Sequence, residues 1–255
     1  FKIKFDFIRS NIYIKLSEFI LFKFFNEIKV KKDNIKFLMS KKNFQLRGIL
    51  RNNWEKVMLN LFYLCDKETL FLDIGANIGI VSCLLANKIK FGFAFEPVPT
   101  SFSKCVQNLN LNKITNIIPL QIALSNKNDL IMITNLKEAL TNYVIDINTE
   151  EGAATAQRDG SVRTLSVKLD NFLMPYIEKI NPKNLLIKID VEGYEKFVLE
   201  GANDLFSLEL PIILCLEYNS EEHLESTKNK LKKYNFQSFT PPKGNDNKNI
   251  FFSNR

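Results

Sequence analysis

Short apolar runs and longer amphipathic stretches alternate along the chain between residues 69 and 252. Apolar runs of strand length predict buried strands at 70–74, 91–95, 117–123, 185–189 and 212–216. Helical spacing of apolar positions predicts helices at 80–87, 101–111 and 221–233, and a terminal strand pair is predicted at 236–239 and 250–252. Continuous apolar strands that alternate with helices are typical of parallel sheets. We therefore predict an α/β fold with a mainly parallel sheet of seven strands and helices on both faces.

The first 50 residues have a different pattern. Apolar positions at rough helical spacing predict a helix over residues 1–35, a short hairpin is predicted at 36–50, and residues 54–64 are predicted to form a helix leading into the core. The first helix would pack on the domain or on a second subunit, or lie on a membrane surface. We divide the chain into an N-terminal helical and hairpin extension, 1–50, and a domain, 51–255.

The alternation breaks between residues 125 and 170. Extra strands are predicted at 130–134 and 164–169, and the stretch 148–163 between them is polar and contains Gly152 and Gly160. A long polar loop inside a compact domain is often functional. We interpret residues 125–170 as an insertion that helps to choose the substrate.

Charge is concentrated at the N-terminus. Residues 1–60 contain fourteen Lys/Arg and five Asp/Glu, a net charge of +9, whereas the other 195 residues contain 21 and 23, a net charge of −2. A basic segment of this kind could contact anionic lipid, acidic glycans or nucleic acid, or be a solvated face. No uncharged apolar run reaches the ~20 residues that a membrane span needs. We expect a cytoplasmic protein, with peripheral membrane contact through residues 1–35 as an option.

Cysteine and histidine usage excludes several kinds of site. The four cysteines form no C-x-x-C pair and lie in apolar surroundings, which predicts reduced, buried thiols and no metal site built from them. The single histidine, His223, excludes a multi-histidine metal site and weighs against a Ser-His-Asp hydrolase. It lies among glutamates in the predicted helix 221–233, which suggests a surface position.

A glycine turn after the first predicted strand is the strongest chemical signal. The stretch Asp73-Ile74-Gly75-Ala76-Asn77-Ile78-Gly79 has glycines where the backbone must turn sharply and approach a ligand. Its spacing departs from the G-x-G-x-x-G dinucleotide pattern. The carboxylate of Asp73 at the strand end suits a cationic amino-acid group better than a pyrophosphate, although a purely structural tight turn stays open.

A second carboxylate, Glu96, ends the second predicted strand and is followed by Pro97. An acidic residue at this point, some 20 residues beyond the glycines, can accept both hydroxyls of a ribose. The glycine turn and Glu96 together indicate a nucleoside ligand with a charged amino-acid tail, which describes S-adenosylmethionine. We assign Ala76 and Pro97, which lie within the two turns, to the same cofactor site.

Three charged residues, Lys188, Asp190 and Glu192, follow one another at every second position around the end of the predicted strand 185–189. In an extended strand they would share one face, and charges there are costly unless they are paired or used. In the functional interpretation Asp190 belongs to the cofactor site and lies beside the cofactor's methyl group. There it could take a proton from a substrate hydroxyl, with Lys188 and Glu217 beside it. A structural lysine–carboxylate pair, or a divalent cation between Asp190 and Glu217, remains open.

These motifs resemble those of the FkbM-type methyltransferases over about residues 50 to 220. The most specific stretch is Ile187-Lys188-Ile189-Asp190-Val191-Glu192-Gly193-Tyr194-Glu195. Further similar positions are the 73–79 turn, Phe95-Glu96-Pro97, Asn108-Leu109-Asn110-Leu111-Asn112, Ala123-Leu124-Ser125, Leu169-Asp170, Leu199-Glu200-Gly201-Ala202, Pro211 and Glu217.

The resemblance implies a class I, Rossmann-like methyltransferase fold that uses S-adenosylmethionine, with O-methylation of sugars or related hydroxyl groups as the commonest activity. It also implies that Asp73, Gly75, Asn77 and Gly79 hold the methionine part, that Glu96 holds the ribose, and that Gln121, Ile122 and Ala123 lie near the adenine. Two alternatives stay open, a nucleic-acid methyltransferase guided by the basic N-terminus and a non-catalytic module tethered by its first helix. The Asn/Asp-Pro-Pro-Tyr/Phe motif of amino-methylating nucleic-acid enzymes is absent, so nucleic acid is the less favoured substrate.

Overall fold

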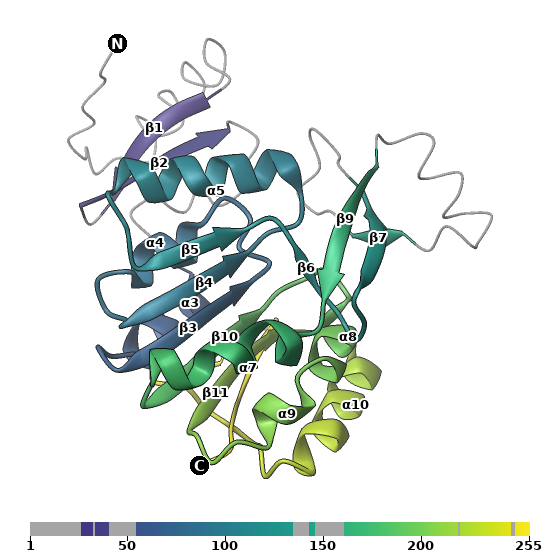
Figure 1. Cartoon of the computed structure of the whole chain (residues 1–255). Helices are drawn as coiled ribbons and strands as arrows, with labels where there is room; N and C mark the ends of the chain where they lie inside the picture. The colour runs from purple at the N-terminus through teal and green to yellow at the C-terminus, as the bar shows by residue number, and fades with distance from the viewer. Residues whose placement is uncertain are drawn as a thin grey trace.

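The fold is centred on one large mixed sheet (Figure 1). The computed structural model describes residues 27–32, 34–40, 55–134, 143–145, 161–218, 220–245 and 248–255. The sheet has the strand order β12-β13-β11-β10-β3-β4-β5, and all its strands run parallel except β13. Its strands are β3 (Thr69–Ile74), β4 (Phe91–Phe95), β5 (Ile117–Leu120), β10 (Asn184–Ile189), β11 (Ile212–Glu217), β12 (Gln237–Phe239) and β13 (Asn249–Ser253). The predicted mainly parallel, seven-stranded sheet is confirmed.

Helices cover both faces of this sheet, as predicted. One face carries α3 (Lys56–Tyr63), α4 (Ile80–Leu85) and α5 (Pro99–Leu111), and the other carries α7 (Leu169–Ile180), α8 (Glu195–Glu200), α9 (Asn203–Phe206) and α10 (Glu221–Lys232). Strand β3 is buried along its whole length, with Phe71 in the first core and Leu70, Leu72 and Ile74 in the second. This two-sided burial explains why its sequence is a continuous apolar run.

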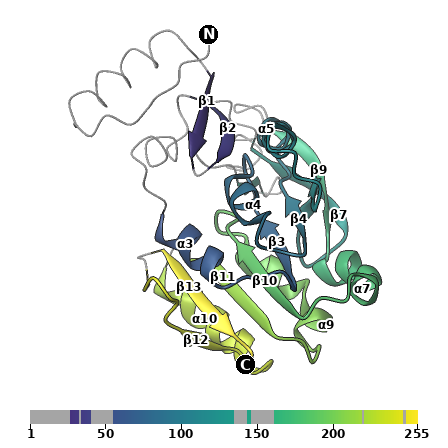
Figure 2. The same cartoon turned by 90° about the vertical axis from the view of Figure 1, so that its left-hand side faces the viewer.

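A basic hairpin, β1 (Glu27–Lys32) and β2 (Ile35–Ser40), packs on α4 and α5 and contributes Phe37 and Met39 to the first core (Figure 2). The predicted helix over 1–35 is therefore wrong for 27–32, and residues 1–26 of that prediction lie outside the described residues. The hairpin predicted at 36–50 exists but begins nine residues earlier, and 41–50 lie outside the described part. Inward-facing apolar residues alternate with outward-facing ones along the two strands: Val30 packs on the core, and Phe37 and Met39 are fully buried. Asn34 has φ 67°, a left-handed conformation that favours a tight hairpin turn.

A second, smaller sheet occupies the region of the predicted insertion. It has the order β6-β9-β7-β8, formed by β6 (Ala123–Leu124), β7 (Asp129–Ile133), β8 (Val144–Ile145) and β9 (Val162–Val167). The arrowheads of β4 and β5 point toward it, so it stands at the carboxyl edge of the large sheet (Figure 1). Most of the predicted polar loop 148–163 lies outside the described residues.

The element bounds differ from prediction in two further places. The single strand predicted at 117–123 is two strands in different sheets, because β5 ends at Leu120 and β6 begins at Ala123. The strand predicted at 164–169 ends at Val167, and Leu169 already begins α7. In the described part of the chain, no helix is long and apolar enough to cross a membrane.

Candidate active site

The glycine turn follows β3 and leaves bare backbone at the carboxyl edge of the sheet. Gly75 has φ 79° and Gly79 has φ 77°, a region that favours glycine. A Cβ atom on Gly75 would lie 1.9 Å from the carbonyl oxygen of Asp190, so only glycine fits there. The amides of Gly75 and Ala76 both donate to the carbonyl of Phe95 at 3.0 Å, which ties the turn to the end of β4.

Asp73 lies beneath this turn and is fully buried. Its Oδ2 accepts a hydrogen bond of 2.6 Å from the Ser82 hydroxyl, and its Oδ1 lies 3.6 Å from the Lys188 ammonium. That Oδ1 atom accepts no hydrogen bond from the residues that the structure describes. The carboxylate thus supports the turn from within and keeps one acceptor position open; its predicted contact with the methionine part stays a prediction.

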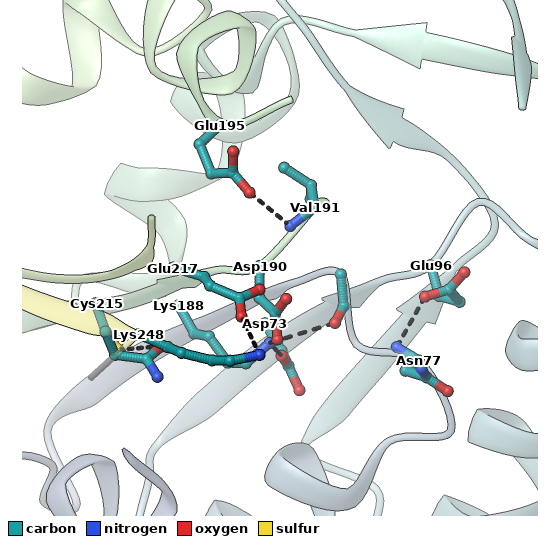
Figure 3. Close-up of polar contacts among 12 residues, drawn as sticks. Asp73, Asn77, Glu96, Lys188, Asp190, Val191, Glu195, Cys215, Glu217 and Lys248 are labelled. Carbon is teal, nitrogen blue, oxygen red and sulfur yellow. Dashed lines mark hydrogen bonds and ion pairs between the residues drawn. The ribbon is translucent and has the colours of Figure 1, made fainter. Parts of the chain in front are cut away.

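Glu96 ends β4 and faces the glycine turn (Figure 3). Its Oε2 accepts the amide of Asn77 at 2.8 Å, and its Oε1 accepts the amide of Val98 at 2.9 Å. Burial raises the pKa of Glu96 to about 7, although the two amides act in the opposite direction. Asn77 takes a left-handed φ of 51° that aims its amide at Glu96. The two predicted halves of the cofactor site are therefore joined directly.

Lys188, Asp190 and Glu217 meet at the ends of β10 and β11 (Figure 3). The buried Lys188 ammonium lies 3.0 Å from Asp190 Oδ2 and donates to the Gly75 carbonyl at 3.3 Å. Burial alone would lower the pKa of Lys188, but Asp190 and Asp73 raise it above its ordinary value. Lys188 is therefore a fixed cation that joins the glycine turn to both aspartates.

The pKa values of Asp190 and Glu217 shift in opposite directions. Burial would raise the pKa of Asp190, but Lys188 and a hydrogen bond from Glu217 lower it. Burial, followed by the hydrogen bond to Asp190 and its charge, raises the pKa of Glu217 to about 8. The two shifts favour an ionised Asp190 that accepts a hydrogen bond from Glu217. Lys248, 3.8 Å from Glu217 Oε1, adds a second cation.

Glu192 joins this group, although the predicted extended geometry is wrong. Strand β10 ends at Ile189, and Glu192 lies beyond it with a left-handed φ of 54°. The turn nevertheless brings carboxylate oxygens of Asp190, Glu192 and Glu217 within 4.8 Å of one another. The carboxylates gather because the loop folds back, and their lysine neighbours balance the charge.

The segment predicted near the adenine follows β5. Gln121 is exposed, Ile122 is half-buried, and Ala123 is buried where β6 begins. Pro97, half-buried, separates Glu96 from α5. These residues lie after the same ends of the parallel strands as Gly75 and Asp190, and their contacts with a ligand stay predictions.

Sequence reasoning missed several groups that hold the site together. The hydroxyl of Ser82 and the amide of Val98 gave no signal, since an ordinary serine and a backbone N–H carry none. His223 was placed on the surface, but its side chain is only 19% exposed and its Nε2 lies 3.9 Å from the buried carboxylate of Glu195. The four cysteines are free and buried, as predicted.

Comparison with known families gives one family match. The family model of the methyltransferase FkbM domain matches residues 73–238, which include the glycine turn, Glu96, Lys188, Asp190 and Glu217. The earlier resemblance is confirmed.

Curated relatives are similar over part of their length. A protein named methyltransferase 1 from Beauveria bassiana is 26% identical over 54% of this chain and 59% of its own. The hexuronic acid methyltransferase AglP from Haloferax volcanii is 29% identical over 58% of this chain and 56% of its own. The chain thus matches less than two thirds of either relative.

A solved structure of similar fold is that of Trm5b from Pyrococcus abyssi, with a TM-score of 0.51 and 13% identity over 90% of this chain and 56% of that chain. At this identity the likeness concerns the fold alone. It agrees with the predicted class I fold with a mainly parallel sheet.

Proposed function

The chain belongs to the methyltransferase FkbM domain family, and on this premise we propose that it transfers a methyl group from S-adenosylmethionine to a hydroxyl oxygen of a sugar, a glycan or a related metabolite. Asp190 carries the proposal, because its partly exposed carboxylate lies 3.0 Å from the Lys188 ammonium, which also donates to the Gly75 carbonyl of the glycine turn.

The described residues fit the cofactor in three respects. Glycine at position 75 lets the turn pass close to the Asp190 backbone, which brings the turn and Asp190 to the same edge of the sheet. Asp73 keeps a buried oxygen that accepts no hydrogen bond within the described part of the chain, and Glu96 presents a carboxylate at the end of the next strand. We assign the amino-acid part of the cofactor to the turn 73–79 and the ribose to Glu96. The assignment of Gln121, Ile122 and Ala123 to the adenine is part of the same proposal.

Asp190 is the group that would take the proton of the acceptor hydroxyl. When bound, S-adenosylmethionine supplies a methyl group on a positively charged sulfur, and a hydroxyl that accepts it must release one proton. The neighbouring Lys188 and a hydrogen bond from Glu217 lower the pKa of Asp190, which favours its ionised form, and its side chain is 37% exposed. General-base assistance of this kind contributes about 10²–10⁴-fold to a rate, and alignment of the hydroxyl supplies most of the remainder.

The acceptor class rests on a relative and on the position of the small sheet. AglP is named for hexuronic acid, a sugar with free hydroxyl groups. The small sheet stands at the carboxyl edge beside Asp190 and is joined to the Asp190 loop by the Ser125 hydroxyl, 3.2 Å from the Tyr194 hydroxyl. We therefore infer that residues 125–170 select a saccharide-like acceptor.

A methyl-transfer assay with mass detection tests this function. The panel holds neutral sugars, uronic acids, nucleotide sugars, RNA and DNA, with Asp190→Asn and the exposed-surface variant Glu225→Gln as a matched pair. We expect product from a sugar, a loss of at least about 100-fold in kcat for Asp190→Asn, and unchanged activity for Glu225→Gln. Cofactor binding, measured by calorimetry, should persist in both variants.

Each other outcome counts against the proposal. Full activity in Asp190→Asn would remove its role as proton acceptor. Methylation of RNA or DNA alone would favour a nucleic-acid enzyme, and failure of the wild-type chain to bind S-adenosylmethionine would favour a non-catalytic module. We also expect activity to survive EDTA, because Lys188 and Lys248 already pair with the carboxylates of Asp190 and Glu217. Loss of activity restored by Mg²⁺ or Mn²⁺ would instead place a cation there.

A further inference from the structure

A fully buried carboxylate, Glu195, lies at the start of α8, five residues after Asp190. Its Oε1 accepts two backbone hydrogen bonds, from the amides of Val191 and Gly193, both at 3.2 Å (Figure 3 draws the first). A buried charge is costly unless it is paired or hydrogen-bonded. The two amides stabilise the buried Glu195 carboxylate, and the carboxylate in turn holds the loop that begins with Asp190.

The held loop has an unfavourable backbone. Glu192 has φ 54° and Gly193 has φ 93°, so two successive residues take left-handed conformations. Such conformations persist only where the surroundings impose them. The upstream side of the loop is anchored separately, because the Asp190 amide donates to the Ile74 carbonyl of β3 at 3.1 Å. Glu195 supplies the matching downstream anchor.

The second oxygen of Glu195 faces the only histidine of the sequence, His223. The distance from Glu195 Oε2 to His223 Nε2 is 3.9 Å, and both atoms are buried without a hydrogen-bond partner among the described residues. The backbone of His223 is fixed, because its amide donates to the hydroxyl of Ser220, the N-cap of α10, at 3.1 Å. The His223 imidazole is therefore held close to the buried Glu195 carboxylate.

We propose that Glu195 is a positioning residue for Asp190: one carboxylate oxygen holds the 191–193 backbone, and the other is seated against His223 of α10. The inference rests on the proposed function, because the exact place of Asp190 matters to catalysis only if Asp190 handles the acceptor proton. Glu195 itself contacts neither cofactor nor acceptor.

Three variants separate positioning from bulk stability. Glu195→Ala removes both acceptor oxygens, Glu195→Gln keeps one carbonyl oxygen that can accept the same two amides, and Glu222→Gln changes an exposed neighbour of His223 as a control. Amide hydrogen exchange followed by NMR reports on Val191 and Gly193, with the Asp190 amide as internal control because its acceptor is Ile74. Steady-state kinetics report kcat and KM for the cofactor.

In Glu195→Ala we expect exchange at Val191 and Gly193 to accelerate about tenfold or more, as for the loss of a hydrogen bond, while the Asp190 amide stays protected. The kcat should fall by a similar factor, with the KM and Kd for S-adenosylmethionine within about twofold. Glu195→Gln should recover most of the protection and of kcat. The imidazole NMR signals of His223, which need no assignment in a one-histidine chain, should shift in Glu195→Gln and not in Glu222→Gln.

Unchanged exchange at Val191 and Gly193 in Glu195→Ala would overturn the proposal, as would equal losses of kcat in the Ala and Gln variants. If the NMR shifts of the His223 imidazole do not change in Glu195→Gln, the proposed contact between Glu195 and His223 is wrong. If Glu195→Ala does not fold, the Gln variant and the His223 signals still decide. A wild-type chain that binds S-adenosylmethionine but methylates no acceptor refutes the proposed function, whereas the exchange data test the anchor independently.

Discussion

Replacement of Gly75 by alanine tests the tightest contact in the site. A Cβ at this position would lie 1.9 Å from the Asp190 carbonyl oxygen, and φ is 79°. A left-handed conformation costs an L-residue about 1–2 kcal/mol. Relief of the contact must also shift the ends of β3 and β10, which puts at risk the hydrogen bonds from Gly75 to Phe95 and from Asp190 to Ile74, each contributing about 1 kcal/mol. We expect Gly75→Ala to lower the free energy of unfolding by about 3 kcal/mol or more.

Two other glycines separate the two causes. Gly193 has φ 93° with no atom within 4 Å of a built Cβ, so Gly193→Ala should cost only the backbone strain, about 1–2 kcal/mol. Gly201 has φ −89°, so it carries no left-handed strain, but its Cβ would lie 2.0 Å from the Ser125 carbonyl oxygen. Gly201→Ala therefore measures the cost of a collision of the same kind as at Gly75, without the cost of backbone strain. Urea unfolding measures each change and calorimetry measures the affinity for S-adenosylmethionine. A Gly75→Ala protein that is no less stable than Gly193→Ala would refute the claimed contact between the turn and Asp190.

Two further predictions concern stability. Asn108→Ala should lower the free energy of unfolding by about 2–4 kcal/mol. It removes the Asn108 Oδ1 that accepts the Leu38 amide at 2.6 Å and the Asn108 Nδ2 that donates to the Ile78 carbonyl at 2.8 Å. Asn110 is exposed, so Asn110→Ala should be nearly neutral in the same urea titration. The pKa of Glu217 is raised from 4.5 to about 8, so the folded state binds the Glu217 proton more tightly than the unfolded chain does. The free energy of unfolding should therefore fall as pH rises from about 4.5 through about 8, and Glu217→Gln should flatten that part of the profile. An identical slope in both proteins would contradict the raised pKa of Glu217.

Strands buried on both faces were the most predictable part of this fold. The run Leu70 to Ile74 is apolar at nearly every position because helices cover both of its faces, and such a run has few other solutions. The hairpin 27–40 was mistaken at its start, because its Phe, Ile, Val and Lys residues fit either period over so short a stretch. Helix α7 was missed because Pro175 lies inside it and its apolar positions follow directly on β9.

The candidate site was predictable where chemistry requires a rare residue at a fixed point of the chain. Gly75, Glu96 and Asp190 all stand at the ends of predicted strands, so the sheet itself brings them together. Glu195 and His223 come from different helices and meet only through the packing of α8 and α10. No local pattern encodes a contact of that kind.

Several residues that carry the family resemblance are structural, and they explain how the acceptor region is held against the chemistry. The carboxylate of Asp170 accepts the amides of Asp204 and Leu205 at 3.0 and 2.9 Å and so caps α9. The Asp170 amide donates to the Gly201 carbonyl at 2.9 Å, and Gly201 lets α8 approach Ser125 closely. Since α8 begins with Glu195, the same short helix fixes both the Asp190 loop and the start of the small sheet. We therefore expect a change at the start of the small sheet to move Asp190 as well.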